Sequence, residues 1–136
     1  MQALPYLNFD GRCAEAFAFY REALGGEIVY SSTYGESPMR DQMPPESHGC
    51  IMHCHLVADG AEIMGADGPP PHDGHGNTCI NLMIDSIEQA ERVYAALSAG
   101  GTVQMPLQET FWAHRWGSFS DRFGKPWMVN CMKQPG

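Results

Sequence analysis

The sequence has few positive charges and no long apolar run. Eight lysine and arginine residues stand against sixteen aspartate and glutamate residues, which gives a formal net charge of −8. The arginines are scattered along the chain, so the basic stripe that draws proteins to phosphate backbones is missing. The longest apolar runs extend over only a few residues, far short of a membrane-spanning helix. We therefore expect neither a nucleic acid nor a membrane as a partner.

Export signals and C-x-x-C cysteine pairs are also absent. Residues 1–5 lack a charged flank and an apolar signal core. The five cysteines are an odd number without any C-x-x-C spacing, which is typical of buried structural thiols in a reducing compartment. We expect a cytoplasmic protein.

Common nucleotide and nucleophile motifs are missing as well. The chain contains no glycine-rich phosphate loop, no G-x-S-x-G nucleophile elbow and no dinucleotide-binding fingerprint. We therefore expect no organic cofactor.

An internal repeat organises the chain. With a shift of 75 positions, residues 6–28 align with residues 81–103. Each copy reads as a short apolar run, an aspartate, a helical stretch, Gly-Gly and a second apolar run. We predict one domain of 136 residues, made of a first module over 1–65, a Pro/Gly-rich connector over 66–78 and a second module over 79–136.

The spacing of apolar residues, and the turn-forming residues between them, predict the helices and strands of each module. Helical spacing predicts one helix over Cys13–Leu24 with Asp10 as its cap, and a second that opens with a Ser86/Gln89 capping box and ends at Gly100. Short runs bounded by Gly, Pro or Asp predict strands, namely Ala3–Phe9, Glu27–Tyr34, Cys50–Ala58, Ala61–Met64, Cys79–Ile84, Thr102–Gln108, Trp116–Ser120 and Trp127–Met132. This order is β-α-β-β-β twice, an α+β fold in which each helix covers one face of a sheet.

Two segments fall outside this pattern. Residues 35–49 contain three prolines and several charges, and we expect a mobile excursion over one face of the sheet. His72, Asp73 and His75 resemble a metal cluster, but they lie in the Pro/Gly-rich connector. We expect a solvated loop there, because no rigid frame would hold a coordination geometry.

Three segments resemble a known family. They are PYLNFDGRCAEAFAFYREALGG at 5–26, IMHCHL at 51–56 and FWAHRWGSFSDRFGKPWMVNC at 111–131. Together they resemble the PhnB-like branch of the vicinal-oxygen-chelate superfamily, which includes glyoxalases, bleomycin-resistance proteins and extradiol dioxygenases. The resemblance implies two βαβββ modules that form cupped, incompletely closed mixed sheets. It also implies a homodimer with a site inside each cup.

The residues at the superfamily's usual metal-ligand positions do not suit a divalent metal. The resemblance places these positions at Pro5 or Tyr6 and near Met64 in the first module, and at Cys79 or Asn81 and near Met128 in the second. A thioether is a poor ligand for zinc, manganese or iron(II). We therefore expect no metal at the standard positions.

His53 and His55 are the candidate catalytic residues. They lie two positions apart on a predicted strand, so both imidazoles point to one face. They could contact a substrate or transfer its proton. With a third ligand such as Glu62 or His114 they could instead chelate a divalent metal. A purely structural, hydrogen-bonded role is the remaining alternative.

A second candidate set lies near the start of the seventh predicted strand. Trp112 offers a flat apolar surface and Arg115 a fixed fork of donors, which together could hold an aromatic or anionic small molecule. With His114 and Tyr6, they are our candidate ligand-binding residues. The alternative is that the tryptophans are core or dimer-interface residues and that Arg115 pairs with a carboxylate such as Asp121.

Two classes of function remain. The first is a homodimeric protein that binds or sequesters a small molecule and lacks the standard metal ligands. The second is a divergent enzyme that abstracts a proton or isomerises its substrate, either without a metal or with one held by His53 and His55. A dimer whose cup has lost its ligand is a third, plainer reading.

Overall fold

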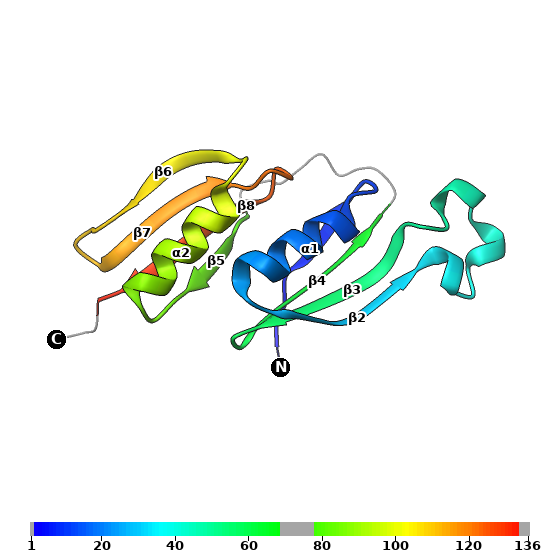
Figure 1. Ribbon diagram of the computed structural model, residues 1–136, viewed down its shortest axis with the longest axis horizontal. Coiled ribbons are helices and arrows are strands. Elements are labelled where there is room, and N and C mark those ends of the chain that lie inside the picture. The colour runs from blue at the N-terminus through cyan, green and yellow to red at the C-terminus, as the bar shows by residue number, and fades with distance from the viewer. Residues whose placement is uncertain (1, 69–77, 134–136) are drawn as a thin grey trace. The chain divides into compact units, whose positions relative to one another are not determined.

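The computed structural model describes residues 2–68 and 78–133. The chain divides into two compact units, Met1–Asp73 and Gly74–Gly136. Each unit contains one α-helix and one four-stranded mixed sheet (Figure 1). The predicted residues His72, Asp73 and His75 lie outside the described residues, as does most of the predicted connector.

In the first unit, the first and last strands are parallel neighbours. Its elements are β1 (Tyr6–Phe9), α1 (Cys13–Leu24), β2 (Glu27–Thr33), β3 (Ile51–Ala58) and β4 (Ala61–Asp67). The strand order is β1-β4-β3-β2. β1 runs parallel to β4, and the other pairs are antiparallel.

The second unit has the same order of elements. They are β5 (Ile80–Met83), α2 (Ile87–Ser98), β6 (Thr102–Gln108), β7 (Ala113–Ser120) and β8 (Pro126–Met132). The strand order is β5-β8-β7-β6, with β5 parallel to β8. The expected α+β fold of two βαβββ modules with incompletely closed mixed sheets is confirmed.

Each helix buries its apolar side against one face of its own sheet. Phe17 and Tyr20 of α1 are fully buried, as are Cys54 and Leu56 on the facing side of β3. In the second unit, Tyr94 of α2 packs edge-on against Phe119 of β7, with ring centroids 5.0 Å apart. We call the side of each sheet that faces away from its helix the reverse face.

The start of α1 differs from the prediction. The residue before the helix is Arg12, and no side chain of a neighbouring residue caps it. Instead, the Cys13 amide donates to Oδ1 of the buried Asp67, at 2.9 Å, and the Ile51 amide donates to Oδ2, at 2.8 Å. The expected cap at Asp10 is therefore wrong, because a carboxylate from the end of β4 takes that place. The cap at Ser86 is confirmed, since its Oγ accepts from the Gln89 amide.

Two strands extend further than their patterns predicted. β4 continues through Gly65 to Asp67, although a glycine usually ends a predicted strand. A Cβ at Gly65 would lie 2.6 Å from Cε1 of Phe17, so this glycine allows the helix to pack closely on the strand. β7 begins at Ala113 and not at Trp116, because Ala113 pairs with Met132 and Arg115 with Cys131. A bulge between Ala113 and Arg115 interrupts the alternation on which the prediction relied.

The excursion between β2 and β3 contains three short 3₁₀ helices. They are η1 (Tyr34–Glu36), η2 (Arg40–Gln42) and η3 (Pro45–Ser47). The amides of Tyr34 and Gly35 donate to the carbonyls of Cys50 and His48, which closes the base of the excursion. Its expected mobility stays a prediction.

Among residues 2–68 and 78–133, no helix has the length and apolar character needed to cross a membrane.

Candidate functional site

The reverse face of the first sheet gathers histidine, tyrosine and glutamate side chains. Tyr30 of β2 pairs with His55 of β3, His55 pairs with Met64 of β4, and Met64 pairs with Tyr6 of β1. Directly paired residues project to the same side of a sheet. These four side chains therefore form one row across the reverse face, and His53 projects to the same face because it lies two residues from His55.

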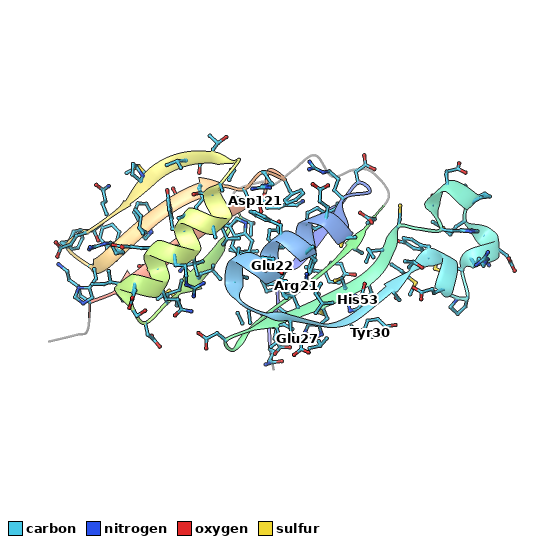
Figure 2. All side chains as sticks on the ribbon, viewed as in Figure 1. Arg21, Glu22, Glu27, Tyr30, His53 and Asp121 are labelled. Carbon is cyan, nitrogen blue, oxygen red and sulfur yellow. The ribbon has the colours of Figure 1, made fainter. Side chains whose placement is uncertain are left out.

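His53 lies between two tyrosines. Its ring centroid is 5.8 Å from that of Tyr6 and also 5.8 Å from that of Tyr30. The Tyr6 hydroxyl and His53 Nδ1 are 3.2 Å apart, within hydrogen-bonding distance. Figure 2 shows His53 and Tyr30 on adjacent strands. The three rings form a continuous aromatic surface.

The Tyr6 hydroxyl stays protonated at neutral pH. Burial raises its pKa, and nearby groups such as the Cys13 thiol raise it further. The hydroxyl can therefore donate to His53 Nδ1, which leaves the opposite ring nitrogen, Nε2, as the N–H donor of a neutral imidazole.

His55 is oriented by a carboxylate. Its Nε2 lies 2.9 Å from Oε1 of Glu62, and the two side chains are partly buried. Because the carboxylate accepts, the proton of a neutral His55 resides on Nε2, and Nδ1 keeps a lone pair. Neither His53 Nε2 nor His55 Nδ1 makes a hydrogen bond with the described residues. Each imidazole thus has one anchored nitrogen and one that is available to a ligand.

The positions that the family resemblance gave for metal ligands lie opposite one another on paired strands, but the side chains there do not fit a divalent metal. Tyr6 lies directly opposite Met64, and Asn81 lies directly opposite Met128. A phenol or amide beside a thioether is a poor donor set for zinc, manganese or iron(II). Within the part of the chain that the structure describes, no three His, Cys, Asp or Glu side chains gather in a metal-binding group.

In the second unit, Arg115 lies on the helix side of its sheet. Its Nε donates to Oε1 of Glu91 on α2, at 3.1 Å, and a terminal nitrogen donates to the His114 carbonyl. Its strand neighbours on that side are Gly117 and Phe119, which contact Tyr94. A Cβ at Gly117 would lie 2.7 Å from Cε2 of Tyr94. Arg115 therefore engages a carboxylate, as the alternative prediction held, but the partner is Glu91 and not Asp121.

The tryptophans of the second unit have different environments. Trp112 and Trp116 pack edge to face with centroids 5.7 Å apart, and both are partly exposed. Trp127 is fully buried, and its indole N–H donates to Oδ2 of Asp121 at 2.8 Å. Trp116 projects to the reverse face, since it pairs with Asn130, whose neighbours Val129 and Cys131 are buried on the helix side. Only Trp127 is a core residue.

Sequence reasoning missed Tyr30. An aromatic residue on a strand next to polar residues could have drawn attention to it. A bulge between Ile28 and Tyr30, however, breaks the alternation that would have shown to which face of the sheet Tyr30 projects. The structure brings Tyr6 together with His53, and His55 together with Glu62. The candidates Trp112, His114 and Arg115 belong to the other unit.

Comparisons with known proteins place the chain in a family. Residues 4–129 match the model of the Glyoxalase/Bleomycin resistance protein/Dioxygenase superfamily. Protein YjdN of Escherichia coli (strain K12) is 36% identical over an alignment of 144 positions, gaps included. The alignment covers 98% of this chain and 97% of YjdN. The crystal structure of protein PA1353 from Pseudomonas aeruginosa is 43% identical with a TM-score of 0.87, covering 98% of this chain and 99% of that one.

A PhnB protein from Bacillus cereus shares the fold at 24% identity. Its TM-score is 0.79, and the match covers 96% of this chain and 99% of that one. The family match and the identity to YjdN both extend over nearly the whole chain. The chain therefore belongs to the glyoxalase/bleomycin resistance protein/dioxygenase superfamily, as a member similar to YjdN and PhnB.

Proposed function

We propose that this protein binds a small organic molecule on the reverse face of the first sheet. One observation carries the proposal: two anchored imidazoles, His53 and His55, each present a free ring nitrogen beside exposed tyrosine rings. Binding sites for small molecules combine apolar or aromatic surface with a few fixed polar groups. The hydrogen bonds to Tyr6 and Glu62 fix the polar groups here.

A fragment screen by NMR on the full chain tests this proposal. We expect the resonances that move on addition of a binding fragment to cluster at Tyr6, Tyr30, His53 and His55. A His53→Ala/His55→Ala double variant should weaken that fragment about tenfold or more, since it removes two hydrogen bonds.

The control is Glu22→Gln on α1, which covers the helix side of the same sheet. It should leave fragment binding to the first sheet unchanged. If the shifts map elsewhere, or if the double variant binds the fragment as tightly as the original protein, the proposal is wrong.

A second candidate function follows from the His55–Glu62 pair. His55 Nδ1 can take a proton from a carbon next to a carbonyl group, and the Glu62 carboxylate then stabilises the imidazolium. The electron pair of the broken C–H bond passes to the carbonyl oxygen as an enolate, and return of the proton regenerates His55.

Incubation of the protein with small carbonyl compounds in deuterated water should incorporate deuterium into these compounds faster than buffer alone. His55→Ala should abolish the excess, and no excess in the original protein would exclude this activity.

The proposed binding protein acts as a homodimer in the cytoplasm. The terminal strands β2, β5 and β6 carry exposed large apolar side chains, namely Val29, Met83 and Met105, which a second copy could cover. All five cysteines are free thiols, which is consistent with a reducing compartment.

A further inference from the structure

The strands of the first sheet contain no lysine and no arginine. Their charged residues are Glu27, Glu62 and Asp67. Asp67 is buried and accepts the amides of Cys13 and Ile51. Glu27 and Glu62 both pair with Val57, so they lie in one row on the reverse face. The net charge contributed by the strands to this face is therefore negative.

Within residues 2–68, the positive side chains are Arg12, Arg21 and Arg40. Arg12 and Arg21 form ion pairs with Glu15 and Glu22 of α1, the helix that covers the opposite side of the sheet. Figure 2 shows Arg21 and Glu22 at this helix. Arg40 lies in η2 and donates to the Gly35 carbonyl. An anionic ligand on the reverse face would find no cationic partner on these strands.

The same face offers what a cation needs. Tyr6 and Tyr30 are 45% and 53% exposed, and both rings flank His53. A cation over the face of a tyrosine ring is attracted by the ring's quadrupole. Glu62 uses Oε1 to hold His55, and its other oxygen makes no hydrogen bond with the described residues. That oxygen can accept from an ammonium group.

From these observations we infer that the ligand of this face is a small organic cation, with its ammonium group held between Glu62 and the face of the Tyr30 ring and its apolar body on the rest of the Tyr6–His53–Tyr30 surface. This inference rests on the proposed function and specifies its ligand class. The inferred ligand has the opposite charge to the anionic ligand that Arg115 suggested in the sequence. The Arg115 guanidinium pairs with Glu91 in the second unit.

Three probes of similar shape and different charge test the inference. Benzylammonium, benzyl alcohol and benzoate are titrated into the full chain at pH 8, and the shifts of the Tyr30, His53 and His55 amides are followed. We expect benzylammonium to bind about tenfold more tightly than benzyl alcohol. Benzoate should bind more weakly than either.

Two variants separate the local carboxylate from the overall charge. Glu62→Gln keeps an oxygen that can accept from His55 and removes the charge, so it should abolish the preference for benzylammonium over benzyl alcohol. Glu22→Gln removes the same charge from α1 and should retain the preference. Tyr30→Leu should weaken benzylammonium more than benzyl alcohol, because it removes the ring but keeps apolar surface.

The outcomes distinguish the ligand class from the binding function. If all three probes bind the face equally, or benzoate binds best, the cation inference is overturned while the proposed binding function stands. Equal losses in Glu62→Gln and Glu22→Gln would also overturn it, because the effect would then come from the general field of an acidic protein. If no probe moves these resonances while the fragment screen finds a neutral or anionic ligand there, the inference is again overturned. If the screen also finds no ligand there, the proposed function fails with it.

Discussion

Asp121 satisfies three donors at the turn between β7 and β8. Oδ1 accepts from the amides of Phe123 and Lys125, and Oδ2 accepts from the indole of the buried Trp127. The carboxylate is itself 3% exposed, so water cannot replace it. The side chain that the sequence offered as a partner for Arg115 thus stabilises the turn of its own hairpin.

Replacing this carboxylate should be costly. Asp121→Ala leaves three donors without their acceptor, and we expect it to lower the free energy of unfolding by about 3 kcal/mol or more. Asp121→Asn should cost less, because the amide oxygen can still accept from the two backbone amides. Urea denaturation of the three proteins measures both differences, and equal stability of Asp121→Ala and the original chain would contradict this role.

For the candidate site, the sequence predicted that the two histidines share one face of the sheet, but it did not predict the direction or the partner of Arg115. The i, i+2 spacing of His53 and His55 on a regular strand determines that they share a face. Arg115 follows a bulge, so its direction cannot be read from the alternation. Its partner Glu91 lies on a helix earlier in the chain, and only the packing of that helix on the sheet brings the two together.

At the scale of elements, the first helix begins on a carboxylate from a distant strand. Asp67 joins the start of α1 to the start of β3 through its two oxygens. We expect Asp67→Ala to lower the free energy of unfolding by about 2–3 kcal/mol, since two amides lose a charged acceptor. Asp10→Ala tests the cap suggested by the sequence and should change stability by less than about 0.5 kcal/mol. A larger loss from Asp10→Ala, measured by the same denaturation assay, would restore the sequence-based cap.

The first 3₁₀ helix should respond to acid. Glu36 accepts from the amide and the hydroxyl of Thr33, and these hydrogen bonds hold its pKa below the ordinary glutamate value of 4.5. Because the folded pKa is lowered, the contribution of Glu36 is present above the unfolded pKa. It is lost as the pH falls through the folded pKa.

We expect the NMR shift of the Thr33 amide to titrate with a midpoint below 4.5. Glu36→Gln should remove this titration and leave the amide shift flat. A midpoint at or above the ordinary value would show that the capping box of η1 does not form in solution.

The extents of the strands were less predictable than their order. Gly65 was predicted to lie beyond the end of its strand because a glycine contributes no side chain to a strand, yet it lies within β4, beneath the ring of Phe17. The order β-α-β-β-β could be predicted from the hydrophobic runs and from the Gly, Pro and Asp residues that bound them. The end of β4 depended on the contact between Gly65 and Phe17, which lies on a helix far away in the sequence.

At the scale of the whole molecule, the exposed terminal strands lead us to expect a dimer. Light scattering coupled to size exclusion should give a mass near twice the chain mass of 15.0 kDa. Lysine substitutions at Val29 on β2 or Met105 on β6 should shift the mass toward that of one chain at whichever edge forms the interface. A mass of one chain for the original protein across the micromolar range would contradict the dimer.

The parallel pairing of β1 with β4 has a consequence for how the nascent chain folds. Tyr6 is opposite Met64 and Phe9 is opposite Asp67, so the first strand of this module can pair only after its last strand has been synthesised. The antiparallel strands β2, β3 and β4 can pair as they emerge, since short connections close at a lower entropic cost than long ones. Tyr6 reaches His53 only when β1 joins β4. We therefore expect the proposed ligand-binding face to be completed only when β1 pairs with β4, and a ligand that binds this face to favour that pairing.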